Sequence, residues 1–208
     1  MSGGWWGGYA EDVTVRQAMA YGASQDPWEL TKALELVAAL DPKLIMEIGC
    51  DRGGTLYAWT AVAPQAQVWG ITLADNGAGT GGSGLALETH GAKVLIGDSH
   101  DPATLAWFAD QMAGPCVDVL FLDGDHSAAG VRQDLAMYGP LVRAGGLILL
   151  HDICSAPDVF CPVEVRQVWE EIHGRYATEE IRNPDSGGQG WGVIRVAAGD
   201  DFAVQVPA

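Results

Sequence analysis

The sequence predicts a doubly wound α/β fold, in which a mostly parallel sheet carries helices on both faces. Short apolar runs of strand length alternate along the chain with longer segments whose apolar residues recur at helical spacing. The runs are apolar at nearly every position, which is typical of strands that are buried on both faces. Hydrophobic residues make up 48% of the 208 residues, and this share fits a globular protein with a full core.

Seven strands are expected from the apolar and extended runs. They cover residues 43–48, 67–72, 93–96, 117–122, 146–150, 176–182 and 191–197. The helix before the first strand has Asp26 as its cap, Pro27 at its first position and Glu29 three residues after the cap. Further helices are expected from the apolar spacing and from proline or glycine at their ends. These cover residues 54–62, a segment beginning at 101–102, a segment around 131–138 and the segment 162–174.

A chain of this length forms one domain by default, and we expect that domain over residues 26–208. Residues 1–25 are a Gly/Trp-rich segment in which Trp5, Trp6 and Tyr9 are candidates for a lid over a substrate pocket. The alternative is a frayed tail. Five glycines between residues 77 and 84 predict a mobile loop after the second strand.

Composition excludes several classes of partner. Lys plus Arg total 11 and Asp plus Glu total 27, so the formal charge is −16. This acidic balance argues against nucleic acid and against an anionic membrane surface as partners. No apolar run approaches the roughly 18 residues of a membrane helix, and we find no signal-peptide pattern. Cys50, Cys116, Cys154 and Cys161 form no CxxC pair. A reduced, cytoplasmic protein is therefore expected.

Polar residues follow the predicted strands where such a sheet binds ligands, at the carboxyl ends. The first strand contains Glu47 and is followed by Gly49, Asp51 and Gly53, a glycine turn that lacks the dinucleotide pattern GxGxxG. The third strand is followed by Asp98 and Ser99.

The fourth and fifth strand ends carry the densest signal. Asp123, Asp125 and His126 lie within four residues after the fourth strand, and His151 and Asp152 end the fifth. Helix capping by Ser127 accounts for one polar residue here, and it leaves the others unexplained. Because these strand ends are expected to be adjacent, both sets should meet in space.

With these motifs, the chain resembles class I S-adenosylmethionine-dependent methyltransferases. Within that class it resembles the small O-methyltransferases related to those acting on antibiotic and sugar hydroxyls, with a relative in cephalosporin biosynthesis. The resemblance runs over residues 43–173. Besides the strand ends, it includes Asp134, Tyr138, the turn at 141–146 and the segment 164–169.

The resemblance implies a Rossmann-like, mostly parallel seven-stranded sheet whose last strand is antiparallel. It implies S-adenosylmethionine as cofactor and O-methylation of a small molecule with a hydroxyl group. Glu47 would orient the glycine turn, and Asp98 would accept from the adenine amino group. The implied cofactor-binding residues are Glu47, Gly49, Asp51, Gly53, Thr72, Asp98 and Ser99. Related enzymes often self-associate, so a homo-oligomer is one alternative and the oligomeric state stays open.

Two positions depart from the family pattern. The second strand ends in the neutral Thr72 where the family has an acidic residue for the ribose, and either Thr72 or Asp75 would take that role. In metal-dependent relatives, such as catechol and caffeoyl-coenzyme A O-methyltransferases, the matching metal positions are Asp123, His151 and Asp152. A histidine in this set makes Mn²⁺, Fe²⁺ or Zn²⁺ as suitable as Mg²⁺, and a metal-free site remains an alternative.

Methyl transfer to a hydroxyl requires removal of its proton. His126 stands three residues after Asp123, where metal-dependent relatives often have a lysine, and it is the first candidate for the base. The predicted catalytic residues are His126, Asp123 and His151. A structural histidine is the alternative interpretation.

Two other function classes are retained. One is a non-catalytic binding or regulatory protein on the same cofactor fold, which the neutral Thr72 favours. The other is a nucleotide-dependent oxidoreductase, against which the absence of GxGxxG counts.

Overall fold

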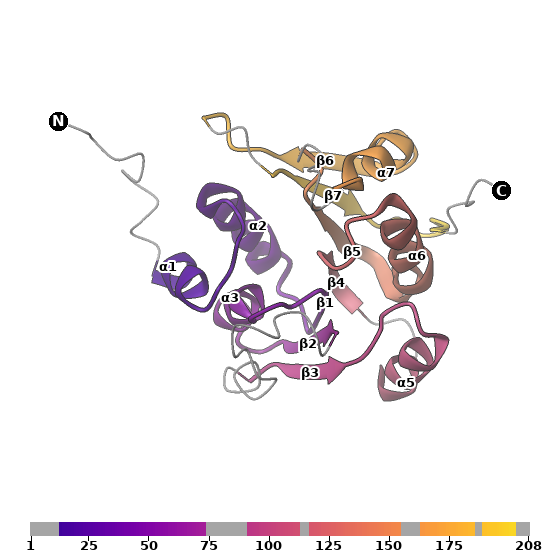
Figure 1. The fold of residues 1–208 in the computed structure, drawn as a ribbon, viewed down its shortest axis with the longest axis horizontal. Helices are drawn as coiled ribbons and strands as arrows, with labels where there is room; N and C mark the ends of the chain where they lie inside the picture. The colour runs from indigo at the N-terminus through magenta and orange to yellow at the C-terminus, as the bar shows by residue number, and fades with distance from the viewer. Residues whose placement is uncertain (1–12, 74–90, 113–116, 155–162, 186–188, 203–208) are drawn as a thin grey trace.

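The structure is a computed structural model of the chain, and it describes residues 13–73, 91–112, 117–154, 163–185 and 189–202. Its central feature is a seven-stranded sheet with the strand order β3-β2-β1-β4-β5-β7-β6 (Figure 1). The strands are β1 (Leu44–Ile48), β2 (Gln67–Thr72), β3 (Lys93–Ile96), β4 (Val117–Leu122), β5 (Val142–His151), β6 (Ala177–Ile181) and β7 (Trp191–Arg195).

The pairing confirms the predicted sheet. The strands from β1 to β5 pair in parallel, and β7 pairs antiparallel with both β5 and β6. The chain runs outward from β1 through β2 to β3 and then returns to β4 on the other side of β1. The strand order therefore reverses between β1 and β4, and sheets of this kind bind ligands at that switch point.

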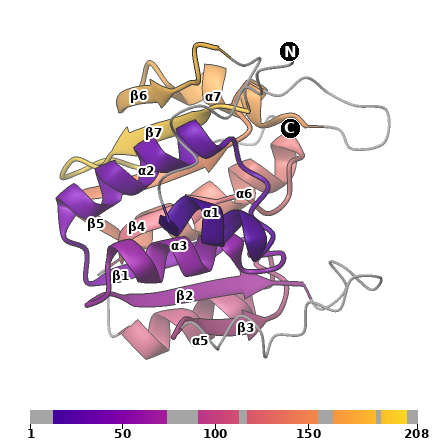
Figure 2. The same ribbon diagram turned by 90° about the vertical axis from the view of Figure 1, so that its left-hand side faces the viewer.

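Helices cover both faces of the sheet, as the sequence predicts (Figures 1 and 2). One face carries α1 (Val13–Ala20), α2 (Pro27–Leu40) and α3 (Gly54–Val62), and the other carries α5 (Pro102–Met112), α6 (Ala128–Tyr138) and α7 (Val165–Ile172). Alternate residues of β1 divide between two cores. Ile45 packs with the α1–α3 side, whereas Met46 and Ile48 pack with the α5–α7 side. This division explains why every residue of the strand except Glu47 is apolar.

The predicted helix signals act as expected at α2. Asp26 Oδ1 accepts hydrogen bonds from the backbone nitrogens of Trp28 at 2.9 Å and Glu29 at 3.1 Å. Pro27 is the first helical residue, and the helix ends at Leu40, followed by the cap residue Asp41 with a left-handed φ of 49°. The helix predicted over residues 54–62 matches α3.

Two boundaries differ from the predictions by several residues. β5 begins at Val142, which pairs with Val117, so the Gly-Gly segment that reads as a turn lies inside a bent strand. A register shift between Val117 and Val119 accommodates that bend. α7 begins at Val165, and Pro162 lies outside the described residues.

The helix α1 was not predicted, because it is short and contributes only Val15 and Ala18 to the buried core. It packs on α3, where a Cβ atom on Gly54 would lie 2.6 Å from the carbonyl oxygen of Ala18. The predicted lid at Trp5, Trp6 and Tyr9 and the loop at 77–84 lie outside the described residues.

Two further expectations concern cysteines and membranes. Cys50 and Cys154 are free thiols, and Cys116 and Cys161 lie outside the described residues. Among the helices that the structure describes, none combines the length and the apolar character needed to span a bilayer.

Candidate active site

The predicted residues after β1, β4 and β5 meet at the carboxyl edge of the sheet. Gly49 allows the first two of these segments to approach closely. It has a φ of 91°, and a Cβ atom there would lie 2.1 Å from the backbone oxygen of Asp123. Only glycine fits such a position. The same backbones are joined by a 2.9 Å hydrogen bond from Asp123 N to Ile48 O. Gly53, with a φ of 84°, caps the start of α3.

Glu47 lies beneath this turn and is completely buried. One carboxylate oxygen accepts from Thr55 Oγ1, and the other accepts from Trp59 Nε1 at 2.8 Å. Burial raises the pKa of Glu47 to about 8, although both hydrogen bonds act in the opposite direction. Because both oxygens are engaged on α3, Glu47 is placed to orient the glycine turn rather than to contact a ligand.

Asp123 is the centre of the hydrogen-bond network. Its Oδ2 accepts from Gln25 Nε2 at 2.7 Å, and its Oδ1 lies 3.3 Å from His126 Nε2 and 3.1 Å from His151 Nδ1. Burial acts to raise the pKa of Asp123, but the charges and hydrogen bonds of the two histidines outweigh it and lower the pKa. The carboxylate form is therefore the stable one.

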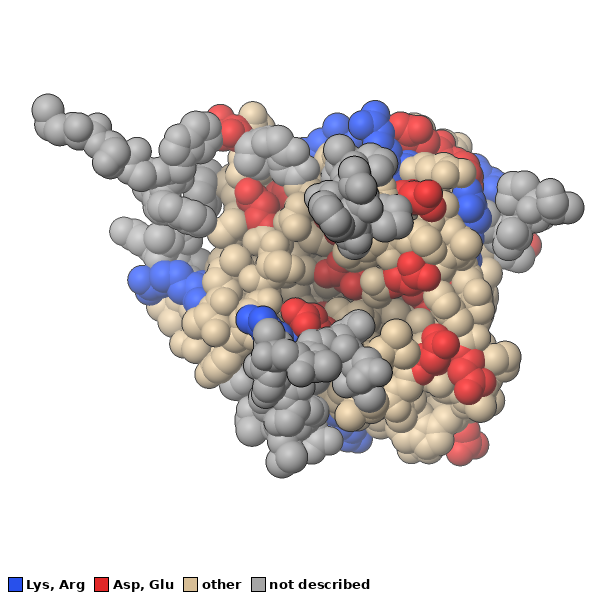
Figure 3. Space-filling view, viewed as in Figure 1, with Lys and Arg blue, Asp and Glu red and all other residues tan. Residues whose placement is uncertain are grey.

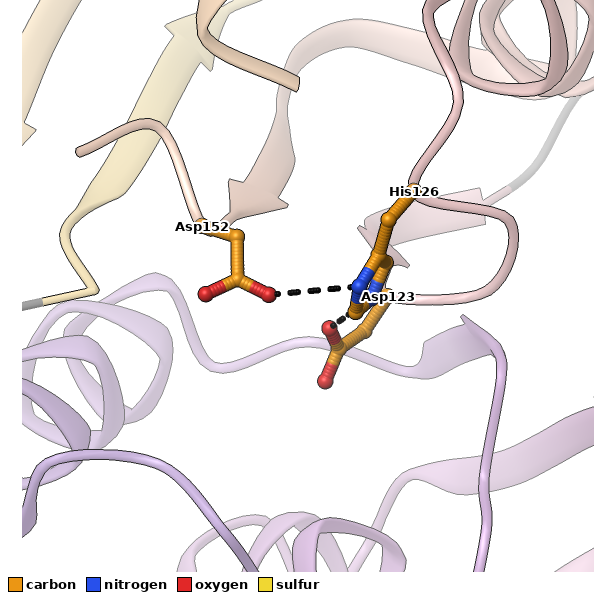
Figure 4. Close-up of side chains that lie close together, drawn as sticks. All are labelled: Asp123, His126 and Asp152. Atoms are coloured by element: carbon orange, nitrogen blue, oxygen red, sulfur yellow. Dashed lines mark hydrogen bonds and ion pairs between the residues drawn. The ribbon is translucent and has the colours of Figure 1, made fainter. Parts of the chain in front are cut away.

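His126 lies between two carboxylates (Figure 4). Besides its contact with Asp123, its Nδ1 lies 3.5 Å from Asp152 Oδ2. Its side chain is 27% exposed, so it borders the solvent, whereas the carboxylates of Asp123 and Asp152 are 12% and 8% exposed. The hydrogen bond with Asp123 is the largest cause that raises the pKa of His126. Its two nitrogens face groups that can orient it and stabilise its protonated form.

His151 is buried more deeply, with 2% of its side chain exposed. Burial acts to lower its pKa, but the negative charge of Asp123 and hydrogen bonds to Asp123 and Asp152 raise it to about 10. The edge-on contact with the ring of Trp191, at 5.2 Å between centroids, fixes its plane. In this arrangement His151 is a buried partner of Asp123, and its assignment as a catalytic residue stays a prediction.

A metal-capable set is present, and it differs from the predicted one by one residue. Asp123, His126 and Asp152 each offer a ligand atom, and these atoms lie within 4.8 Å of one another. The prediction had His151 in place of His126. The two ring nitrogens of His126 lie 3.3 Å from Asp123 Oδ1 and 3.5 Å from Asp152 Oδ2. The predicted His151 is equally near, since its Nδ1 lies 3.1 Å and 3.5 Å from the same two oxygens. One nitrogen and two carboxylate oxygens form a mixed set that suits Mn²⁺, Fe²⁺ or Zn²⁺.

Two adjoining cavities, both lined by Gly49 and Gly124, flank this cluster. The first, which we call the acidic cavity, has a volume of about 210 Å³ and contains Asp51 as well as the cluster. The second, which we call the strand-end cavity, has a volume of about 380 Å³ and lies at the ends of β2 and β3. Figure 3 shows acidic side chains gathered around a hollow near the middle of this face.

The strand-end cavity contains the predicted residues Thr72, Asp98 and Ser99. Thr72 Oγ1 is buried and has no hydrogen-bond partner among the described residues, so it is available to a ligand. Asp98 Oδ1 accepts from the backbone nitrogen of His100 at 2.9 Å, which holds the turn after β3. The alternative ribose contact, Asp75, lies outside the described residues.

Sequence reasoning missed the segment between α1 and α2 and one residue near β7. Gly22, Ala23, Ser24 and Gln25 line the acidic cavity, as does Gln189. These residues do not follow the parallel strands at their carboxyl ends, so the search of strand ends could not find them. Only their tertiary placement brings them to the site.

The middle of the chain is similar in sequence to known proteins. Residues 46–153 match the model of the methyltransferase domain family. Two curated relatives are mycinamicin VI 2''-O-methyltransferase of Micromonospora griseorubida and demethylmacrocin O-methyltransferase of Streptomyces fradiae. They are 31% identical over 107 residues and 28% identical over 104 residues, respectively. Each match covers 50% of this chain and 24% of the relative, so the chain spans about a quarter of either protein.

Solved structures share the fold at low sequence identity. The O-methyltransferase TomG from Streptomyces achromogenes, in complex with SAM, has a TM-score of 0.68 at 16% identity, covering 90% of this chain and 91% of TomG. MycE, a methyltransferase solved with Mg, SAH and mycinamycin VI, has a TM-score of 0.62 at 19% identity, covering 93% of this chain and 56% of MycE.

Proposed function

The chain belongs to the methyltransferase domain family, and from this premise we propose that it transfers a methyl group from S-adenosylmethionine to a hydroxyl of a small-molecule acceptor. One observation carries the proposal. Asp123, His126, His151 and Asp152 converge within hydrogen-bonding distance beside two adjoining cavities at the switch point of the sheet. Perturbed pKa values of charged groups in a cleft mark a functional site.

The residues present fit the cofactor. S-adenosylmethionine supplies an electrophilic methyl group on a positively charged sulfur. Thr72, with its unpartnered hydroxyl, and Asp98 would bind the adenosine part in the strand-end cavity. The turn at Gly49 lets backbone approach the ligand, while Asp51 adds negative charge in the acidic cavity. This charge favours a cationic ligand.

On the acceptor side, His126 is the residue we propose as the general base. It lines the acidic cavity and is partly exposed, so an acceptor hydroxyl can reach it. Asp123 and Asp152 hold its ring and would stabilise the imidazolium that forms when it takes the proton. His151 in turn neutralises Asp123 from the buried side.

A divalent metal is a second element of the proposal. Asp123 and Asp152 would hold it, with His126 or His151 as the third ligand. A bound metal ion lowers the pKa of a coordinated hydroxyl. A histidine nitrogen that binds the ion cannot also take the proton, so ion binding through His126 would leave that role to another group.

The acceptor class comes from the relatives. The names of the two curated relatives describe O-methylation, and MycE was solved with mycinamycin VI. Hydroxylated macrolides and their sugars are therefore the first acceptors to test, followed by phenols.

The experiment that tests the cofactor is isothermal titration of the chain with S-adenosylhomocysteine and, separately, with NADH. We expect binding of S-adenosylhomocysteine and none of NADH. Binding of NADH alone would instead favour the oxidoreductase alternative. Consumption of S-adenosylmethionine in the presence of a hydroxylated acceptor would then exclude a non-catalytic binding protein.

A further inference from the structure

The connection between α1 and α2 brings one side chain to the centre of the site. Gln25 Nε2 donates to Asp123 Oδ2 at 2.7 Å, and Gln25 is only 4% exposed. Because a carboxylate can only accept, the amide nitrogen of Gln25 must face Asp123, and this fixes which end of the amide is the oxygen. Gln25 Oε1 is buried and has no hydrogen-bond partner among the described residues.

The backbone around Gln25 is held on both sides. A Cβ atom on Gly54 would lie 2.1 Å from the backbone nitrogen of Ala23, so the start of α3 packs directly against this connection. On the other side, the backbone nitrogen of Asp26 donates to Gln189 Oε1 at 3.1 Å. Gln25 is therefore held in place before any ligand binds.

The chemistry of the acidic cavity indicates what Gln25 Oε1 would bind. A buried carbonyl oxygen without a donor is destabilising, and a ligand N–H or O–H would satisfy it. The carboxylates of Asp51, Asp123 and Asp152 also line this cavity, and they outnumber its two histidines. Acceptors and negative charge together fit a protonated amine.

We propose that Gln25 binds the amino group at the amino-acid end of the methyl donor through Oε1, while its Nε2 remains on Asp123. This inference rests on the proposed function, which places the adenosine part against Thr72 and Asp98. The cavity walls at Gly49 and Gly124 continue from there into the acidic cavity, where Gln25 lies. Gln25 thus links the cofactor to the carboxylate that orients His126. It lies outside the family match, which begins at residue 46.

The test uses two ligands that differ in the group Gln25 is inferred to bind. S-adenosylhomocysteine carries the amino-acid end, whereas 5′-methylthioadenosine has the same adenosine and thioether without it. The variant Gln25→Met keeps the length of the side chain and removes both hydrogen-bonding atoms. Titration calorimetry should show about ten-fold or greater weakening for S-adenosylhomocysteine and little change for methylthioadenosine. Gln65→Met, in the exposed turn before β2, is the matched control and should bind both ligands as the natural chain does.

Equal weakening of both ligands, or no change in either, would overturn the role of Gln25. If the natural chain binds neither ligand, the proposed function fails and this inference fails with it. If thermal unfolding shows that Gln25→Met does not fold, the natural chain decides the question. It should then bind an S-adenosylhomocysteine analogue that lacks only the amino group about ten-fold more weakly than S-adenosylhomocysteine itself, and equal affinity would overturn the inference.

Discussion

At the scale of single residues, the site is a chain of contacts that runs from the surface inward. His126 borders the cavity, Asp123 orients it, and His151 neutralises Asp123 from the buried side. Each group has a separate task because each has a different exposure. We therefore assign the proton transfer to the most exposed of the three, His126.

Replacing His126 by alanine should lower turnover by about 100-fold or more, because a positioned general base contributes at least that factor. The affinity for S-adenosylhomocysteine should change much less, since His126 lies on the acceptor side. Steady-state assays and calorimetry measure the two quantities. His173→Ala, which replaces an exposed histidine at the end of α7, is the control. Equal losses of turnover and cofactor affinity in His126→Ala would contradict the assignment as base.

Glu47 gives a prediction about pH. Its pKa is about 8 in the folded chain, against 4.5 for a free glutamate, because burial disfavours the charged form. Between these values the unfolded state loses the proton while the folded state keeps it, so this group lowers the free energy of unfolding as pH rises from about 4.5 to 8. The variant Glu47→Gln cannot ionise, so its stability should fall less over this range. Urea unfolding at several pH values measures the difference.

The exposed Glu35, which pairs with Lys32 on α2, supplies the control. Glu35→Gln should leave the pH profile close to that of the natural chain, because exposed ion pairs contribute little. Parallel profiles for Glu47→Gln and the natural chain would mean that Glu47 is ionised in the folded protein.

At the scale of elements, the site depends on how closely the turn after β1 approaches the turn after β4. Gly49 allows that close approach because it has no side chain. Its φ is 91°, and a Cβ atom there would lie 2.1 Å from the backbone oxygen of Asp123. Helix α3 and Glu47 hold the same turn from below. Gly49 is therefore needed for the packing of these two turns, whether or not a ligand is bound.

Gly49→Ala should therefore destabilise the chain by more than about 2 kcal/mol, since it adds a steric clash to backbone strain. Gly91→Ala is a matched control. Gly91 has a similar φ of 84°, but a Cβ atom there would meet no atom of the described residues within 4 Å, so the backbone strain is the expected cost. Denaturant unfolding measures the loss of stability in each variant, and the difference between the two losses is the cost of the clash. Similar losses in the two variants would show that strain alone accounts for Gly49.

At the scale of the whole molecule, local patterns predicted most of the architecture. Strands buried on both faces are apolar at nearly every position, and residues such as Asp26 and Pro27 mark helix starts, so both kinds of element can be located from the local sequence. The helix α1 and the early start of β5 escaped prediction because their stability comes from packing on α3 and from pairing with β4. Neither contact has a signal in the local sequence.

The sequence predicted part of the site. The predicted groups Asp123, His126, His151 and Asp152 follow strands, and a parallel sheet brings such residues together. Gln25 contacts Asp123 across 98 positions of sequence, and only the tertiary fold reveals it. His126 joins Asp123 and Asp152 in the metal-capable set, and its place there depends on the turn after β4, which periodicity does not specify.

The net charge of −16 also has a spatial meaning. Part of it lies around the two cavities, at Asp51, Asp98, Asp123 and Asp152, where it favours a cationic ligand.

The most direct test of the central claim is a crystal structure of the chain grown with S-adenosylhomocysteine and Mn²⁺. We predict the adenosine against Thr72 and Asp98, and the amino-acid end beside the turn at Gly49. We predict the ion bonded to Asp123 and Asp152. S-adenosylhomocysteine bound away from the two cavities, or an ion held without Asp123, would contradict the account.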